Sequence, residues 1–166
     1  MQIEPIAQSK LLILYLLKTI SIQLSELQIL RIVTENGWLN YFDLKECMFE
    51  LIESRLVEQR DTPSGMFYSI TELGNTTVYY LAKEMPASLR KSIDTYCEAN
   101  RDELRLETEL CADYIKIDES EYKVMLKVLE NQAPVFELNI VTYSQASAET
   151  FINKWKSVAP KIYKHT

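Results

Sequence analysis

The residue types that enzymes use for catalysis are sparse in this chain of 166 residues. Its one histidine, His165, lies next to the last residue, where order is least expected, which argues against a histidine triad or a histidine metal cluster. The three glycines are isolated, so no glycine-rich loop could cradle a phosphate. We therefore predict that the protein is not an enzyme and uses no metal and no cofactor.

The three cysteines, Cys47, Cys97 and Cys111, are odd in number and show no paired spacing, which disfavours a disulfide framework or a zinc site. We interpret them as small core residues, with redox sensing by Cys97 or Cys111 as the alternative. The acidic run at residues 118–121 lacks the glycine and the spacing of a calcium loop, and is typical of a solvated turn. These features predict a cytoplasmic protein.

A different chemistry, contact with duplex DNA, is open to side chains near the start of a predicted helix at residue 40. The N-terminal residues of a recognition helix lie nearest the base edges, and a following hairpin can reach phosphate or the minor groove. The predicted DNA-binding residues are Asn40, Tyr41, Phe42, Lys45, Arg60 and Ser64. For Asn40 and Tyr41 a structural role stays open, as a helix cap and as part of the core.

Charge opposes this hypothesis. The net charge is −6, and residues 1–85 contain seven Lys/Arg against eleven Asp/Glu. At 100° per residue, the outward face of the same helix has Phe42, Glu46, Phe49 and Glu53, with Glu50 beside them, and carboxylates repel phosphate. Two alternatives remain. Either the helix start and hairpin alone contact DNA, with a dimer doubling the contacts, or the domain binds protein through Phe42 and Phe49.

The elements that would position these residues follow from apolar spacing. Apolar side chains recur at three- and four-residue steps over residues 9–20, which predicts a first helix. A second helix begins at Ser25, which heads a capping box, and ends at Asn36-Gly37. The short connection to the third helix is typical of a helix-turn-helix. Two extended stretches, residues 57–61 and 66–71, flank a turn at residues 62–65 and form a predicted hairpin. Thr71 then caps a predicted fourth helix that ends near Met85, before Pro86. We therefore predict a winged helix-turn-helix domain over residues 1–85.

Residues 86–166 form the second predicted domain. A helix over residues 87–105 precedes three alternating stretches around residues 110–114, 122–128 and 136–140, which predict a small three-stranded antiparallel sheet. A final helix from Ser144 would cover the sheet with Phe151, Ile152, Trp155, Val158 and Ile162. The predicted fold class is α+β, and this domain would serve dimerisation or effector binding. The apolar run at residues 11–17 is too short for a bilayer, so we expect a buried helix and no membrane association.

Several stretches resemble a known family. The segments WLNYFDLKECMFELIESRLVE and MFYSITELG look like a PadR-like winged helix. With TYCEANRDELRLETELCADY, EYKVMLKV and INKWKSVAPKIY, the similarity extends to a domain-of-unknown-function family of low-GC Gram-positive bacteria. The resemblance implies an N-terminal winged helix, a C-terminal α/β region and, by analogy of fold, a transcriptional regulator. We expect a homodimer that binds double-stranded DNA and responds to an unidentified small-molecule effector. The alternative is a winged-helix protein-interaction module without DNA affinity.

Overall fold

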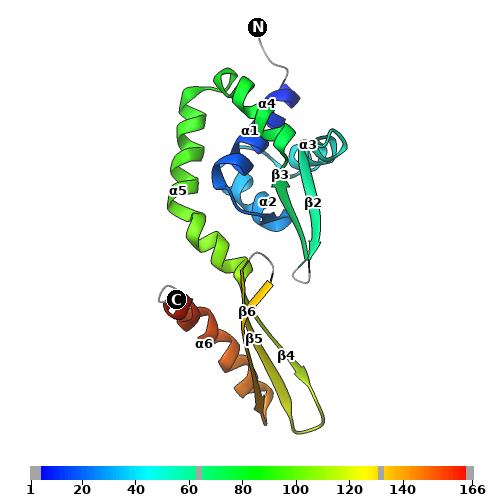
Figure 1. Ribbon diagram of the computed structural model, residues 1–166, viewed down its shortest axis with the longest axis vertical. Helices are drawn as coiled ribbons and strands as arrows, with labels where there is room; N and C mark the ends of the chain where they lie inside the picture. Colours follow the sequence, from blue (N-terminus) through cyan, green and yellow to red (C-terminus); the bar gives the residue numbers. More distant parts are fainter. Residues whose placement is uncertain (1–4, 63–64, 131–132, 164–166) are drawn as a thin grey trace. The chain divides into compact units, whose positions relative to one another are not determined.

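The chain forms two units, Met1–Leu104 and Arg105–Thr166, in a computed structural model that describes residues 5–62, 65–130 and 133–163. Figure 1 shows the order of the elements. The first unit contains α1 (Pro5–Ile20), β1 (Leu24–Ser25), α2 (Glu26–Glu35), α3 (Tyr41–Glu53), β2 (Val57–Thr62), β3 (Gly65–Ile70) and α4 (Glu72–Leu81). A short 3-10 turn (Ala82–Glu84) leads to α5 (Ala87–Glu109), which crosses the boundary. The second unit adds β4 (Leu110–Lys116), β5 (Tyr122–Glu130), β6 (Ala133–Thr142) and α6 (Gln145–Tyr163).

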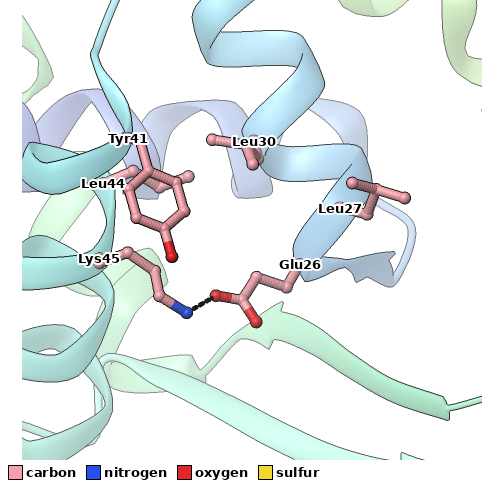
Figure 2. A pocket seen from close by; sticks show the side chains of 6 residues that line it. All are labelled: Glu26, Leu27, Leu30, Tyr41, Leu44 and Lys45. Carbon is pink, nitrogen blue, oxygen red and sulfur yellow. Dashed lines mark hydrogen bonds and ion pairs between the residues drawn. The ribbon is translucent and has the colours of Figure 1, made fainter.

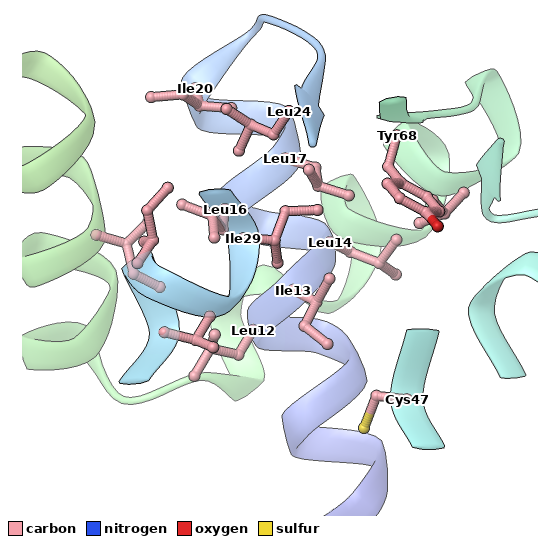
Figure 3. Close-up of a cluster of buried hydrophobic side chains, with 14 of the residues drawn as sticks. Leu12, Ile13, Leu14, Leu16, Leu17, Ile20, Leu24, Ile29, Cys47 and Tyr68 are labelled. Atoms are coloured by element: carbon pink, nitrogen blue, oxygen red, sulfur yellow. The ribbon is translucent and has the colours of Figure 1, made fainter. Parts of the chain in front are cut away.

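Helix α1 is the centre of the first unit. Its apolar side chains project on all sides, and a helix of that kind must be enclosed by other elements. Figure 3 shows side chains gathered around it. The surrounding residues that are at most 1% exposed include Ile29, Ile32 and Val33 of α2, Leu44, Cys47 and Leu51 of α3, Val78 of α4, and Ile93 and Cys97 of α5. The expected buried helix is confirmed. Among the described residues, no helix is both long and apolar enough to cross a membrane.

Three predicted helix starts are confirmed by their side-chain caps. Ser25 Oγ accepts a hydrogen bond from the Gln28 amide at 3.1 Å, and the Ser25 amide donates to Gln28 Oε1 at 3.0 Å, which completes the capping box of α2. Thr71 Oγ1 accepts from the Gly74 amide at 3.0 Å at the start of α4. Asn40 caps α3 in the same manner. These caps determine the residue at which each helix begins.

The fold differs from the prediction in its number of sheets. The sequence predicted a hairpin and one three-stranded sheet, whereas the structure has two three-stranded sheets, with strand orders β1-β3-β2 and β4-β5-β6. The additional strand is β1, in which Leu24 lies opposite Tyr68 and Ser25 opposite Phe67. Two residues are too few to show strand alternation, and Ser25 is also a helix cap, so the sequence pattern did not reveal the strand.

Hydrogen bonds join α5 to the rest of the first unit. The Tyr15 hydroxyl donates to Asp94 at 2.6 Å, and the Arg101 guanidinium donates to the carbonyl oxygens of Thr19 at 2.8 Å and Ile20 at 2.9 Å. Those carbonyls end α1, where intrahelical donors run out, so Arg101 satisfies them. The first unit therefore includes α5 as far as Leu104.

In the second unit, α6 covers one face of an antiparallel sheet. Strand β5 is central, with Leu110 of β4 opposite Val128 and Thr142 of β6 opposite Tyr122. The core comprises Val124, Leu126 and Val128 of β5 with Ala148, Trp155 and Ala159 of α6. The predicted covering face of α6 is partly wrong. Trp155 is buried and Ile152 half-buried, but Phe151 and Val158 are exposed, and the Ile162 side chain lies outside the described residues. Two alanines take part in the contact because small side chains let the helix approach the sheet.

Gly74 generates a prediction about stability. A Cβ at this position would lie 2.3 Å from the Leu56 carbonyl oxygen and 2.6 Å from Cγ1 of Ile70, so α4 fits against the hairpin only without a side chain there. We expect Gly74→Ala to lower the free energy of unfolding by about 1–3 kcal/mol, as overpacking does. Asn75→Ala, at the exposed next position, should change it by no more than about 0.5 kcal/mol. Urea unfolding measures both, and equal stability of the two variants would contradict the packing.

The buried thiols generate a prediction about pH. Burial raises the pKa of both Cys47 and Cys97 from 9.0 to about 11. These thiols ionise at a lower pH in the unfolded chain than in the folded chain. Between about pH 9 and about pH 11 the folded state therefore binds more protons, and the free energy of unfolding falls as the pH rises. We expect Cys97→Ala to remove the part of this pH-dependent loss that Cys97 causes, on the order of 2 kcal/mol of the free energy of unfolding between about pH 9 and about pH 11. Urea unfolding from pH 8 to 11 measures the slope, and an unchanged slope would contradict it.

Candidate nucleic-acid interface

The candidate interface is built on α3, whose two faces differ sharply. Leu44, Cys47, Met48 and Leu51 recur at helical spacing and are buried, so this face packs into the core next to α1. The preceding turn passes through Gly37, whose φ of +69° favours glycine. With its inner face fixed, α3 presents its N-terminal end and its outer face to solvent.

Three predicted residues open α3. The Asn40 side chain accepts a hydrogen bond from the Asp43 amide at 2.8 Å, so it acts as the helix cap. Tyr41 and Phe42 follow, with exposed fractions of 47% and 80%, and their rings meet edge to face at 5.4 Å. The structural role proposed for Asn40, as a helix cap, is therefore confirmed, whereas Tyr41 lies outside the buried core. Phe42 is the most exposed aromatic residue of this group.

Lys45 lies one turn further and is held by an ion pair. Its ammonium contacts the Glu26 carboxylate at the start of α2 and lies 5.9 Å from the centre of the Tyr41 ring (Figure 2). The hydrogen bond to Glu26, more than any other influence, raises the pKa of Lys45. A phosphate approaching Lys45 would have to compete with this carboxylate.

A shallow groove separates α2 from α3 beside this ion pair. Figure 2 shows its lining, with the α2 side chains on one side and the α3 side chains on the other. The lining residues are Glu26, Leu27, Leu30, Tyr41, Leu44 and Lys45. Its apolar side chains and the ion pair between Lys45 and Glu26 offer a contact surface.

Of the last two predicted residues, the structure describes only Arg60, which belongs to the hairpin. Arg60 lies on β2 opposite Phe67 of β3, and its side chain is exposed between exposed Glu58 and Asp61 in the chain. Ser64 lies outside the described residues. The structure thus brings Asn40, Tyr41, Phe42 and Lys45 together at one end of α3, and places Arg60 on a separate element of the same unit.

The outer face of α3 is acidic and aromatic, as its sequence indicated. Glu46 and Glu53 are exposed, and Phe49 between them is 66% exposed. Glu50 pairs with Lys10 of α1, with 2.6 Å between Nζ and Oε2. Lys10 and Glu26, the partners of Glu50 and Lys45, were not among the predicted residues. They come from other helices, so no spacing in the chain could have indicated them.

Metal binding and redox sensing by cysteine are the other kinds of chemistry to consider for the described residues. Among the described residues, no three histidine, cysteine, aspartate or glutamate side chains gather closely enough to hold a metal ion. Cys97 is fully buried, and its raised pKa disfavours the thiolate that redox sensing requires. Cys111, on β4, is half-buried.

The chain belongs to the family described as domain of unknown function DUF4364, whose model matches residues 9–166. The match spans both units, so the family is defined by their combination and not by the first unit alone. No curated protein and no solved structure matches the chain.

Proposed function

We propose that the protein is a winged-helix transcriptional regulator of PadR-like type that binds double-stranded DNA as a homodimer. The observation that carries this proposal is the sheet order β1-β3-β2, in which a strand between α1 and α2 pairs with the hairpin that follows α3. This pairing fastens the hairpin to the helices. The start of α3 and the hairpin then remain exposed on one domain, as a helix in the major groove with a flanking wing requires.

The proposed contacts follow from the side chains at these places. Lys45 would bind phosphate or a guanine edge once it leaves Glu26, and the exposed Phe42 ring suits the methyl group of thymine. Tyr41 can donate its hydroxyl hydrogen to a phosphate oxygen. Arg60 of the hairpin would contact backbone phosphate. Asn40 contributes by fixing the helix start and not by reading a base.

Charge sets the strength of this binding. The unit Met1–Leu104 contains ten Lys/Arg and fifteen Asp/Glu, and two of its lysines, Lys10 and Lys45, are in ion pairs. A monomer therefore has few cations to offer to phosphate, and the acidic outer face of α3 must stay away from the duplex. Doubling of the contacts in a dimer compensates for this weakness.

We expect duplex binding to be detectable at about 50 mM salt and to weaken steeply at about 200 mM. Lys45→Ala should reduce the affinity for duplex DNA. It should also lower the slope of the logarithm of the binding constant against the logarithm of the salt concentration by about 1, because one phosphate contact is lost. Glu26→Gln should strengthen binding, since it releases Lys45. Lys83→Ala, an exposed lysine outside the site, is the charge-matched control. Fluorescence anisotropy with a labelled random duplex measures all four proteins, and equal effects of Lys45→Ala and Lys83→Ala would contradict the placement.

One observation favours a second candidate, a protein-binding surface. Phe42 and Phe49 are both largely exposed on a face rich in carboxylates, a combination that suits a basic partner with apolar side chains. The same anisotropy experiment separates the two functions. Phe49→Ala should leave DNA affinity unchanged, because Phe49 lies away from the helix start. Absence of duplex binding at low salt would favour the protein partner.

A further inference from the structure

We propose that β6 is a dimerisation strand, which pairs antiparallel with β6 of a second copy to form a six-stranded sheet. The inference deepens the proposed function, because it names the surface of the proposed homodimer, and it does not depend on DNA binding. Strand β6 is the outer strand of the order β4-β5-β6. One side of its ten-residue backbone is bonded to β5. The other side presents the hydrogen-bonding groups of an edge strand.

The composition of β6 is unusual for an edge that stays in water. Proteins usually protect such edges with charged residues, prolines or bulges. Strand β6 has one charged residue, Glu137, which pairs with Lys127 of β5 at 3.6 Å. Its proline, Pro134, and a shift in the register with β5 at Val135 are both confined to its start. The edge strand of the other sheet, β2, has three charges in six residues, Glu58, Arg60 and Asp61. By this comparison β2 carries charges along most of its length, whereas β6 is protected only at its start and is open to pairing from Phe136 onward.

Apolar side chains are exposed on both faces of β6. Val141, on the face away from α6, is 50% exposed, and Val135, at the shift in register, is 57% exposed. Phe136 and Leu138 lie on the face covered by α6 yet remain about 40% exposed, at 41% and 42%. Phe136 stacks on the Trp155 ring of α6 with 5.8 Å between the ring centres. Pairing with another strand would bury part of all four side chains.

The strand is complementary to itself in one register, and this indicates a second copy as the occupant. With Leu138 opposite its counterpart, Phe136 faces Ile140 and Glu137 faces Asn139, all within the part of β6 that follows the shift in register. Moving the centre to Glu137 would place two carboxylates directly opposite each other, which is destabilising. In the Leu138 register, apolar side chains meet apolar ones and each carboxylate meets a neutral amide.

Symmetry and charge are compatible with this pairing. Directly opposed residues of an antiparallel pair point to the same face, so a two-fold axis perpendicular to the sheet keeps α6 on one face in both copies. Residues 105–166 contain eight Lys/Arg and nine Asp/Glu, so this unit is almost neutral, unlike the first unit. Two copies of the second unit can therefore approach with little repulsion.

The test is the oligomeric state of the full chain, measured without DNA by sedimentation equilibrium. We expect Asn139→Glu to raise the dimer dissociation constant about tenfold or more, because it creates two Glu–Glu pairs across the two-fold axis. The matched control Asn139→Lys creates two Lys–Glu pairs and should retain the dimer. Asn139 is exposed, and circular dichroism checks that both variants fold. A monomeric wild type, or a dimer that Asn139→Glu leaves intact, would overturn the proposal.

Cross-linking tests the register. In a Cys111→Ser background, Leu138→Cys places two thiols on directly opposed residues, whose Cα atoms in antiparallel sheets lie about 4.5–5.5 Å apart, within disulfide range. We expect an oxidised covalent dimer for Leu138→Cys and none for Val135→Cys, because position 135 lies away from the two-fold axis at Leu138 and does not oppose its own counterpart. The reverse pattern would overturn the register. Since neither experiment contains DNA, failure here is distinct from failure of DNA binding.

Discussion

The burial of α1 is the constraint on which the first unit depends. Its apolar side chains point in all directions, so no single neighbouring surface can cover them, and α2, α3, α4 and α5 each contribute buried residues. Fully burying one large aliphatic side chain contributes about 1.5–3 kcal/mol before entropy is counted. The same requirement fixes the rotation of α3, because Leu44, Cys47 and Leu51 must face inward. Everything proposed for the outer surface follows from that rotation.

The rotation of α3 leaves two kinds of surface next to each other. Its N-terminal end, with Tyr41, Phe42 and Lys45, lies beside the groove to α2, and its outer face holds Glu46, Phe49 and Glu53. Ion pairs with Glu26 and Lys10 moderate the charges of both surfaces. The proposed DNA binding would depend on a small number of phosphate contacts, so the proposed association of two copies would become part of its affinity. The largely apolar edge strand β6 is the surface that we propose for that association.

Much of the local structure was predictable because its signals are local. The caps at Ser25, Asn40 and Thr71 and the three strands of the second unit follow from side chains a few residues apart. Strand β1 was missed because two residues carry no period. The exposure of Phe151 could not be foreseen, because the alanines of α6 set how the helix lies on the sheet. For the site, exposure of Phe42 was predictable, whereas the pairing of Lys45 with Glu26 depends on how two helices pack.

The most direct test of DNA binding through α3 and the hairpin is an amide chemical-shift titration of the full chain with random duplex DNA at low salt. We expect the shifts to be concentrated at the start of α3, around Tyr41 and Lys45, and on the hairpin, around Arg60. The amides of Phe49 and Glu53 should change little. Such a pattern would place the duplex where the fold and the exposed cations allow it. Absence of shifts at these positions, or shifts centred on Phe49, would contradict the DNA-binding claim and direct attention to a protein partner.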